Sequence, residues 1–244
     1  MRFSVGYLTF FYLYHMNSDH LYTIIVAGGS GTRMNAKVPK QFLTLNGLPI
    51  LMHTIKAFHT YENGMKIILA LPEQDISYWE QLCLQHDFTI PVTIVKGGAT
   101  RFESVRNGLN HIEERYGIVA VHDGVRPLVS QELIHASFST AIQKGNAVAA
   151  IALKDSVRKV TAEGNEAVDR AAYRLVQTPQ VFSLPLIKNA YKMAKHANYT
   201  DDATVVEASG HPIQLIEGEG SNIKITTPED LLVAEYLLKS GVIG

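Results

Sequence analysis

The sequence has one cysteine and almost no net charge, and each shortage excludes a class of protein. Cys83 stands alone among 244 residues, so an intrachain disulfide and a multi-cysteine metal site are excluded. The formal net charge of −1 gives no general attraction to polyanions, and there is no continuous basic run. We therefore expect no nucleic-acid partner and no membrane partner. A lone cysteine also suits a reducing compartment, so the expected location is the cytoplasm.

An apolar run long enough to cross a bilayer is also missing at the start of the chain. Residues 3–14 are apolar and aromatic, but they are too few to span as a helix and no Ala-x-Ala cleavage pattern accompanies them. A secretory leader is the less favoured alternative. We interpret residues 1–20 as an N-terminal extension, with Met16 as an alternative start, because residues 21–26 already supply a complete first strand. The remainder, residues 21–244, is long enough for one main domain.

Short β-branched runs alternate with amphipathic stretches along most of the chain. This alternation predicts an α/β fold with a mostly parallel sheet and helices on both faces. The expected strands are residues 22–26, 66–71, 92–95, 118–121, 147–151 and 213–216. The expected helices are residues 49–60, 101–115, 131–144, 185–197 and 228–239, and prolines near three of their starts suit a first helical turn.

The segment of residues 154–168 does not fit this alternation, because it is polar and charged. The turn Glu163-Gly164-Asn165 separates two extended arms, which predicts a β-hairpin. A lone hairpin is marginally stable in water. The residues alone leave two interpretations open, a mobile surface loop or an arm that packs against a second copy of the chain.

A glycine-rich loop follows the first strand and is flanked by two cations, Arg33 and Lys40. Glycines at the carboxyl end of a strand let backbone N–H groups approach phosphate oxygens, which predicts a nucleotide site. The loop fits neither a Walker motif, which needs Gly-Lys followed by a hydroxyl, nor a dinucleotide fingerprint, whose last glycine would fall at Met34. A flexible glycine turn is the alternative, but it would not explain the flanking cations.

These residues resemble the sugar-phosphate nucleotidyltransferases, and later motifs narrow the resemblance to the 2-C-methyl-D-erythritol 4-phosphate cytidylyltransferase family. It covers about residues 22–239, and ribitol-5-phosphate cytidylyltransferases are similar. Each motif is weak or moderate alone, but their order is specific. The motifs are Ala27-Gly28-Gly29-Ser30-Gly31-Thr32-Arg33-Met34, Pro39-Lys40-Gln41, Gly97-Gly98, Arg101, Ser104-Val105, His122-Asp123-Gly124-Val125-Arg126-Pro127, Asp155-Ser156, Val168-Asp169-Arg170, Gln177-Thr178-Pro179-Gln180, Thr200-Asp201-Asp202-Ala203 and Asn222-Ile223-Lys224-Ile225-Thr226.

The resemblance implies a Rossmann-like nucleotidyltransferase sheet, a hairpin dimerisation arm at residues 154–176, and Mg²⁺ as cofactor. It also implies a role for each matching residue. The catalytic residues would be Arg33 and Lys40, which stabilise the transition state, and Arg170 and Lys224, which position the acceptor phosphate. The CTP site would be Ala27, Gly28, Gly29, Gly31, Gly97, Gly98 and Ser104, and the acceptor site would be Asp123, Arg126, Ser156 and Thr178. In the family, the residues matching Arg170 and Ser156 come from the neighbouring subunit of a homodimer.

Electrostatics supports these assignments, because CTP and a sugar phosphate together bring about six negative charges. Asp123 follows an apolar strand and is the expected Mg²⁺ ligand, unless Asp123-Gly124 is only a turn. Lys224 lies in an alternating segment, residues 222–226, which predicts a strand whose polar face enters the cleft. Without the family, a solvated Lys224 and a helix-surface Ser104 are the alternatives.

Three positions depart from the family's usual residues. Gly124 stands where alanine is usual, Ala99 where an acidic residue is frequent, and Ser156 where threonine is usual. The expected function is transfer of a cytidylyl group from CTP to 2-C-methyl-D-erythritol 4-phosphate. The alternatives are the ribitol 5-phosphate reaction and a nucleotide-sensing protein without turnover. The four cations argue against the second alternative, because binding alone would not require them all.

Overall fold

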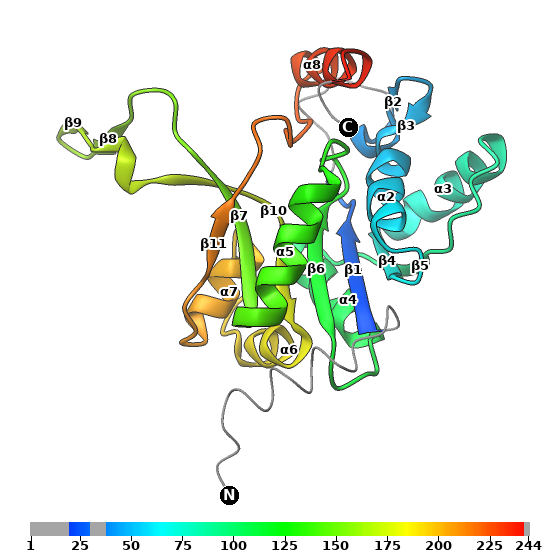
Figure 1. Ribbon diagram of the computed structural model, residues 1–244, viewed down its shortest axis with the longest axis horizontal. Coiled ribbons are helices and arrows are strands. Elements are labelled where there is room, and N and C mark those ends of the chain that lie inside the picture. Colours follow the sequence, from blue (N-terminus) through cyan, green and yellow to red (C-terminus); the bar gives the residue numbers. More distant parts are fainter. Residues whose placement is uncertain (1–19, 30–37, 242–244) are drawn as a thin grey trace, which may run out of the picture.

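One sheet of seven strands organises the chain, and six of them run in the same direction. The computed structural model describes residues 20–29 and 38–241, and Figure 1 shows the sheet between two helical layers. The strand order is β11-β7-β10-β6-β1-β4-β5, and β10 is antiparallel to both of its neighbours. The other pairs are parallel, which confirms the predicted mostly parallel sheet. The strands are β1 (Leu21–Val26), β4 (Lys66–Leu71), β5 (Thr93–Lys96), β6 (Ile118–Asp123), β7 (Asn146–Ala152), β10 (Arg174–Ser183) and β11 (Leu215–Glu217).

The two central strands are buried on both faces, which is why they read as continuous apolar runs. Every residue of β6 is buried, and the neighbours Ile24 and Ile25 of β1 are each fully buried in a different apolar cluster. Successive side chains of a strand point to opposite faces. The clusters are therefore the two layers of core on either side of the sheet.

Helices cover both faces of the sheet, as predicted. One cluster holds apolar residues of α2 (Ile50–Tyr61), α3 (Glu73–Gln85) and α5 (Gln131–Lys144). The opposite cluster holds residues of α4 (Arg101–His111), α6 (Leu184–Met193) and α7 (Asp202–Ala208). A third, smaller cluster joins α8 (Pro228–Lys239) to the short strand β2 (Thr44–Leu45). Strand β2 follows the 3-10 turn η3 (Lys40–Phe42) and pairs with β3 (Leu48–Pro49).

The sequence prediction missed strand β10, which lies in the middle of the sheet. Its first residues, Arg174 to Val176, are exposed, while the residues after them are buried. The buried part contains Gln177, Thr178 and Gln180, so it shows neither an apolar run nor a regular alternation. The pairing with β7 is also irregular between Val176 and Gln180.

The predicted strand at residues 222–226 is wrong, because no sheet pairing forms there. The predicted alternation of side chains nevertheless holds. Ile225 is fully buried and Ile223 packs against the same cluster, while Lys224 between them lines a pocket. Tertiary contacts, described below, hold this segment in place of a strand ladder.

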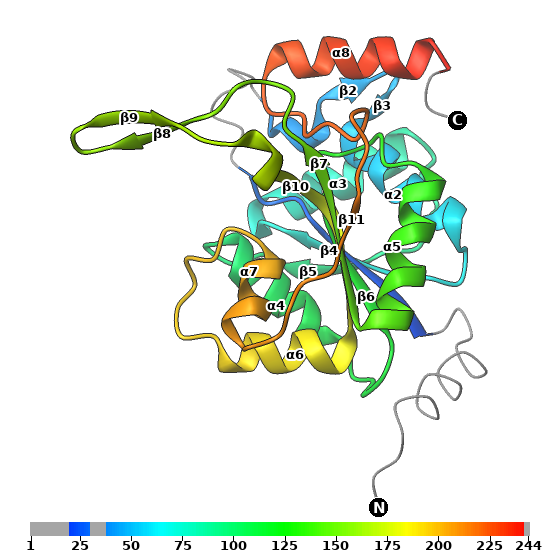
Figure 2. The same cartoon turned by 60° about the vertical axis from the view of Figure 1, so that its left-hand side comes forward.

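The predicted hairpin is confirmed and projects sideways from the sheet (Figures 1 and 2). Strands β8 (Arg158–Thr161) and β9 (Gly164–Ala167) pair antiparallel only with each other, and the turn η4 (Arg170–Ala172) leads back to β10. Val160 near the tip is 82% exposed. Among the described residues, none of the helices has the length and apolarity needed to cross a membrane.

Helix α4 approaches β1 closely at Gly108, and we predict that Gly108→Ala destabilises the protein. An added Cβ would lie 2.9 Å from Cγ2 of the fully buried Ile24. Overpacking of this kind costs about 1–3 kcal/mol, which exceeds the gain in helix propensity of about 1 kcal/mol. Urea unfolding followed by circular dichroism should show a net loss of about 1 kcal/mol.

The matched control is Asn110→Ala, at an exposed position of the same helix. This variant gains helix propensity without meeting the sheet, so its stability should stay within about 0.5 kcal/mol of the parent. A Gly108→Ala protein as stable as Asn110→Ala would contradict the close approach.

Candidate active site

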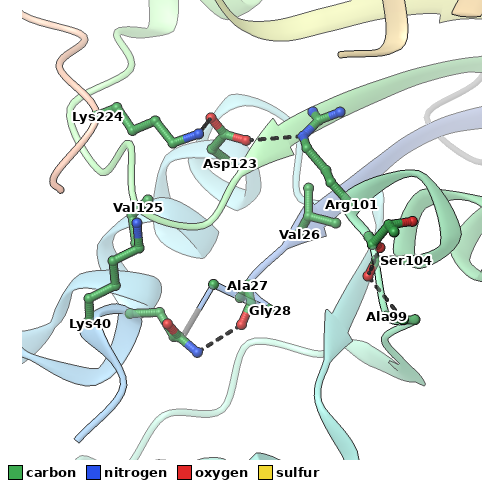
Figure 3. Close-up of a pocket in the computed structure, with 14 residues that line it drawn as sticks. Val26, Ala27, Gly28, Lys40, Ala99, Arg101, Ser104, Asp123, Val125 and Lys224 are labelled. Atoms are coloured by element: carbon green, nitrogen blue, oxygen red, sulfur yellow. Dashed lines mark hydrogen bonds and ion pairs between the residues drawn. The ribbon is translucent and has the colours of Figure 1, made fainter. Parts of the chain in front are cut away.

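A pocket lies where β1 and β6 end, at the carboxyl edge of the sheet. Open α/β sheets bind ligands at this edge. Segments far apart in the sequence supply its walls, and Figure 3 shows how their side chains face one another. The lining residues are Val26, Ala27, Gly28, Gly29, Lys40, Gln41, Gly98, Ala99, Thr100, Arg101, Ser104, Asp123, Val125 and Lys224.

Asp123 is the centre of charge in this pocket, because three cations face its carboxylate. Lys224 Nζ lies 2.9 Å from Oδ2, Arg126 Nε lies 3.4 Å from Oδ2, and Arg101 Nε lies 3.5 Å from Oδ1. Burial alone would raise the pKa of Asp123, but the charges of Arg101, Lys224 and Arg126 outweigh it. They hold this pKa well below the usual carboxyl range, so Asp123 is ionised at neutral pH.

The glycine side of the pocket is fixed by Gln41 and by close contact with Lys40. Gln41 is buried and its Nε2 donates to the carbonyl oxygen of Ala27 over 2.8 Å. A Cβ placed on Gly29 would lie 3.2 Å from Cε of Lys40. Glycine at this position therefore lets the lysine side chain lie directly against the backbone after β1.

The opposite wall is the turn that leads from β5 into α4. Thr100 and Glu103 form a capping box at the start of the helix. The Ser104 hydroxyl accepts from Gly98 N and donates to Thr100 O, both over 3.0 Å. A Cβ on Gly98 would lie 2.2 Å from Cβ of Glu103, so this turn requires glycine. Ser104 is only 4% exposed, which excludes the helix-surface interpretation.

Lys224 is held at the pocket by the buried amide Asn222. Asn222 Nδ2 donates to Thr178 O over 2.8 Å, and Arg126 Nη1 donates to Asn222 O over 2.7 Å. Gln177 Nε2 donates to Glu219 O over 2.8 Å, just before this segment. Hydrogen bonds to β10 and to the loop after β6 thus hold this segment, in place of the strand pairing that was predicted. The side chain of Lys224 remains 42% exposed, and its amine is paired with Asp123 at the pocket.

The structure brings most of the predicted site residues together. Ala27, Gly28, Gly29, Lys40, Gly98, Ser104, Asp123 and Lys224 line the pocket. Three more adjoin it: Gly97 N donates to Leu71 O, Arg126 contacts Asp123, and the Thr178 hydroxyl accepts from Asp123 N over 3.1 Å. Ser156 and Arg170 do not line it, because both are exposed on the arm. The predictions for Gly31 and Arg33 lie outside the described residues.

Sequence reasoning missed the roles of Arg101, Gln41 and Asp202. Arg101 belonged to a recognised motif, but nothing in the sequence showed that it bridges Asp123 and Asp202. Its Nη2 lies 2.8 Å from Asp202 Oδ2. Gln41 follows Lys40 directly, but the sequence did not show that its side chain is buried. Asp202 also belonged to a motif of the family, and the structure shows that its neighbour Asp201 caps α7 by accepting from Thr204 N.

The donor set for a divalent metal is small in the described part of the chain. Asp123 is the only carboxylate that lines the pocket, and no group of three metal-binding side chains occurs there. Mg²⁺ is frequently bound by one or two carboxylates together with substrate phosphates. One ionised carboxylate at the pocket fits this mode of binding, and a protein-only metal cage does not fit.

Comparison with known proteins shows which family the chain belongs to. Residues 21–240 match the family model described as 2-C-methyl-D-erythritol 4-phosphate cytidylyltransferase. The chain belongs to this family. It is 49% identical over 215 residues to the cytidylyltransferase of Bacteroides fragilis, covering 88% of this chain and 98% of that protein. It is 51% identical over 219 residues to that of Azobacteroides pseudotrichonymphae, covering 89% and 98%.

Solved structures of this cytidylyltransferase family have the same fold as this chain. The enzyme of Thermus thermophilus superposes with a TM-score of 0.73 at 32% identity, covering 90% of this chain and 99% of that chain. A 4-diphosphocytidyl-2C-methyl-D-erythritol synthase from Anaerococcus prevotii gives a TM-score of 0.78 at 27% identity, covering 92% and 100%. The predicted nucleotidyltransferase fold is confirmed.

His122 precedes Asp123 on β6, and it does not line the pocket. It is fully buried, its Nε2 lies 3.0 Å from Arg126 O, and its ring meets Phe58 edge-on at 4.9 Å between centroids. Burial lowers the pKa of His122 to about 4. A carbonyl partner requires Nε2 to carry a proton, and the lowered pKa makes the ring neutral at neutral pH.

We predict that His122 makes stability depend on pH. The unfolded imidazole binds a proton below about pH 6.5, whereas the folded one does so only near pH 4. The free energy of unfolding therefore falls as pH is lowered from about 6.5 toward 4, by up to about 1.4 kcal/mol per pH unit from this group. Urea unfolding of His122→Gln should show a shallower fall between pH 6.5 and 5.

Glutamine keeps an N–H donor for Arg126 O, so the variant tests the titration more than the hydrogen bond. Between pH 7 and 8 the imidazole is neutral in both states, and the two proteins should then have parallel pH profiles. Equal slopes below pH 6.5 would contradict the prediction.

Proposed function

We propose that this protein transfers the cytidylyl group of CTP to 2-C-methyl-D-erythritol 4-phosphate in isoprenoid synthesis, at the pocket around Asp123. The observation that carries the proposal is the convergence of Lys40 and Lys224, distant in sequence, on one pocket at the carboxyl edge of the sheet. Family membership supplies the substrates. We assign the whole reaction to one domain, residues 21–244, including the arm of residues 154–176.

The reaction is an in-line displacement at the α-phosphorus of CTP. An oxygen of the acceptor phosphate forms the new bond, and the bond to the β-phosphate oxygen breaks, so pyrophosphate leaves with its electron pair. No general base is needed, because a phosphate monoester is already largely ionised at neutral pH. Lys40 and Arg33 stabilise the charge that develops on the phosphoryl oxygens, while Lys224 holds the acceptor phosphate.

Backbone groups around Ala27, Gly28, Gly29 and Gly31 would bind the CTP phosphates. The turn of Gly97 and Gly98 faces them across the pocket and would bind the cytosine edge through backbone groups. Ser104 already holds that turn through two hydrogen bonds, so we assign it chiefly to fixing the turn. Buried hydrogen-bond partners that match cytosine reject other bases, because a mismatch leaves polar groups unpaired.

The acceptor side of the pocket is proposed to be Asp123, Arg126 and Thr178. Arg126 is only 9% exposed and already bonds Asn222 O and Asp123, so it acts chiefly by fixing those groups. Asp123 would hold Mg²⁺ together with the CTP phosphates. When bound, Mg²⁺ neutralises part of the triphosphate charge. Chelation of divalent metal should therefore abolish turnover.

The proposal includes a homodimer in which the arm completes the partner's site. Exposed apolar side chains along the arm and its stem support this, since an isolated hairpin with exposed apolar residues is stabilised by packing against a partner surface. They are Val160 (82% exposed), Leu175 (53%), Tyr173 (46%) and Val176 (43%). Arg170 and Ser156 would reach the acceptor phosphate of the neighbouring subunit. A cytoplasmic location is also proposed, supported by the free cysteine Cys83.

Pyrophosphate release with CTP and each acceptor in turn tests the reaction. We expect turnover with 2-C-methyl-D-erythritol 4-phosphate and at least about tenfold lower kcat/KM with ribitol 5-phosphate. Lys40→Ala should lower kcat by about 100-fold or more while the KM for CTP changes little. Preference for ribitol 5-phosphate would establish the alternative acceptor, and no release with either would reject the function.

Mixing inactive variants tests the shared site. In a dimer of Arg170→Ala with Lys224→Ala, one site keeps its own Lys224 and receives an intact Arg170, whereas the other site lacks both. Random exchange of equal amounts should therefore restore about a quarter of the parent activity. Activity is measured as pyrophosphate release after subunit exchange has been confirmed by mass spectrometry.

The matched control mixes Lys40→Ala with Lys224→Ala. Both residues would belong to the same chain at each site, so every mixed dimer has two defective sites and no activity should return. Recovery in this control, or none in the first mixture, would contradict the shared site.

A further inference from the structure

A second carboxylate lies behind Asp123 and shares its arginine. Asp202, at the start of α7, is fully buried, and its Oδ2 lies 2.8 Å from Nη2 of Arg101. The other side of the same guanidinium group faces the pocket, where Nε lies 3.5 Å from Asp123 Oδ1 (Figure 3). Asp202, Arg101, Asp123 and Lys224 thus form a row of alternating charges that runs from the core to the pocket.

Asp202 is held firmly at the inner end of this row. Tyr191 OH donates to its Oδ1 over 2.6 Å. Its backbone N–H and that of Ala203 both donate to Oε1 of Gln180 on β10, over 3.0 and 2.8 Å. Helix α7 is therefore already attached to the central sheet through backbone N–H groups, and this attachment does not need the Asp202 carboxylate.

The guanidinium group of Arg101 lies nearer to the carboxylate of Asp202 than to that of Asp123. Its shorter ion pair is to the buried Asp202, and its contact with Asp123 is longer by 0.7 Å, from 2.8 to 3.5 Å. Burial disfavours the charge of Arg101, yet Asp202 and then Asp123 keep the pKa of the guanidinium raised. Without Asp202, the partly buried Arg101 would turn to the nearest remaining carboxylate, because leaving its charge unpaired is costly. That carboxylate is Asp123.

We propose that Asp202 is a positioning residue for the transfer reaction: it holds Arg101 back from Asp123, which leaves Asp123 to orient Lys224. The proposal rests on the proposed function for the role of Lys224. Without Asp202, Arg101 closes on Asp123 and competes with the amine of Lys224. The acceptor phosphate then loses its alignment, while the glycine walls that would bind CTP are untouched.

Asp202→Asn compared with Asp201→Asn tests this role. Both variants remove one carboxylate at the start of α7. Asp201 is the N-cap residue and accepts from Thr204 N and from Gln180 Nε2, whereas the ion pairs of Arg101 are with Asp123 and Asp202. Asparagine remains a good helix cap and keeps an acceptor oxygen. Asp202→Asn should lower kcat by about 10- to 100-fold with a KM for CTP within about threefold of the parent. Asp201→Asn should stay within about threefold in both constants.

A cycle with Arg101→Gln tests whether Asp202 acts through Arg101. The double variant Arg101→Gln with Asp202→Asn leaves no unpaired buried charge, so it can fold even where Asp202→Asn alone does not. If Asp202 works only by placing the arginine, the double variant has the same kcat as Arg101→Gln. Losses that multiply would overturn the proposal, because independent effects are additive in free energy.

Acetylation of Lys224 gives a readout that does not need turnover. Lys239 on α8 serves as the internal reference, since it lies on another element. In Asp202→Asn the amine of Lys224 should be released from Asp123, so its acetylation relative to Lys239, followed by mass spectrometry, should rise about twofold or more. An unchanged ratio, or equal kcat in the Asp202→Asn and Asp201→Asn proteins, would overturn the proposal. A parent protein without transferase activity would instead reject the proposed function, and the acetylation ratio would still decide the role of Asp202.

Discussion

The carboxylate of Asp123 and the cations around it are the interaction on which the site depends. A single buried aspartate at the end of β6 faces Lys224, Arg126 and Arg101, which come from three separate segments. Arg126 is buried and Arg101 is partly buried, and burial of such charges would be costly without a partner charge. Asp123 makes their convergence possible before substrate arrives, and the excess of positive charge is what a triphosphate requires.

The sheet topology explains why the pocket has two unlike walls. The end of β1 and the turn after β5 present glycines whose backbone is open to a ligand. Antiparallel β10 reaches the same edge from the other direction and brings Gln177, Thr178 and Gln180 beside β6. These buried polar side chains fix the loops that carry Asp123, Lys224 and Asp202. The parallel half of the sheet thus supplies the glycine wall, and the antiparallel strand anchors the charged wall.

The sequence predicted what depends on local pattern. Most strands and helices, both faces of helices, the hairpin and most pocket residues followed from periodicity, turn residues and ordered motifs. It failed where tertiary contacts decide. Strand β10 carries amides and an irregular register, and residues 222–226 keep the alternation of a strand while Asn222 bonds to β10. Arg101 was visible as a motif residue, but its two carboxylate partners lie 22 positions along at Asp123 and further on at Asp202.

The charge row and the arm both concern how cationic side chains are aligned. Phosphoryl transfer requires little covalent chemistry from the protein, so rate depends on how well cations are placed. Within one chain, placement comes from buried groups that cannot move, with Asp202 and Gln180 as its foundation. The exposed arm has no such support in its own chain, since β8 and β9 pair only with each other. Arg170 is proposed to act in the site of the neighbouring subunit, where its alignment would depend on the surface that the arm packs against.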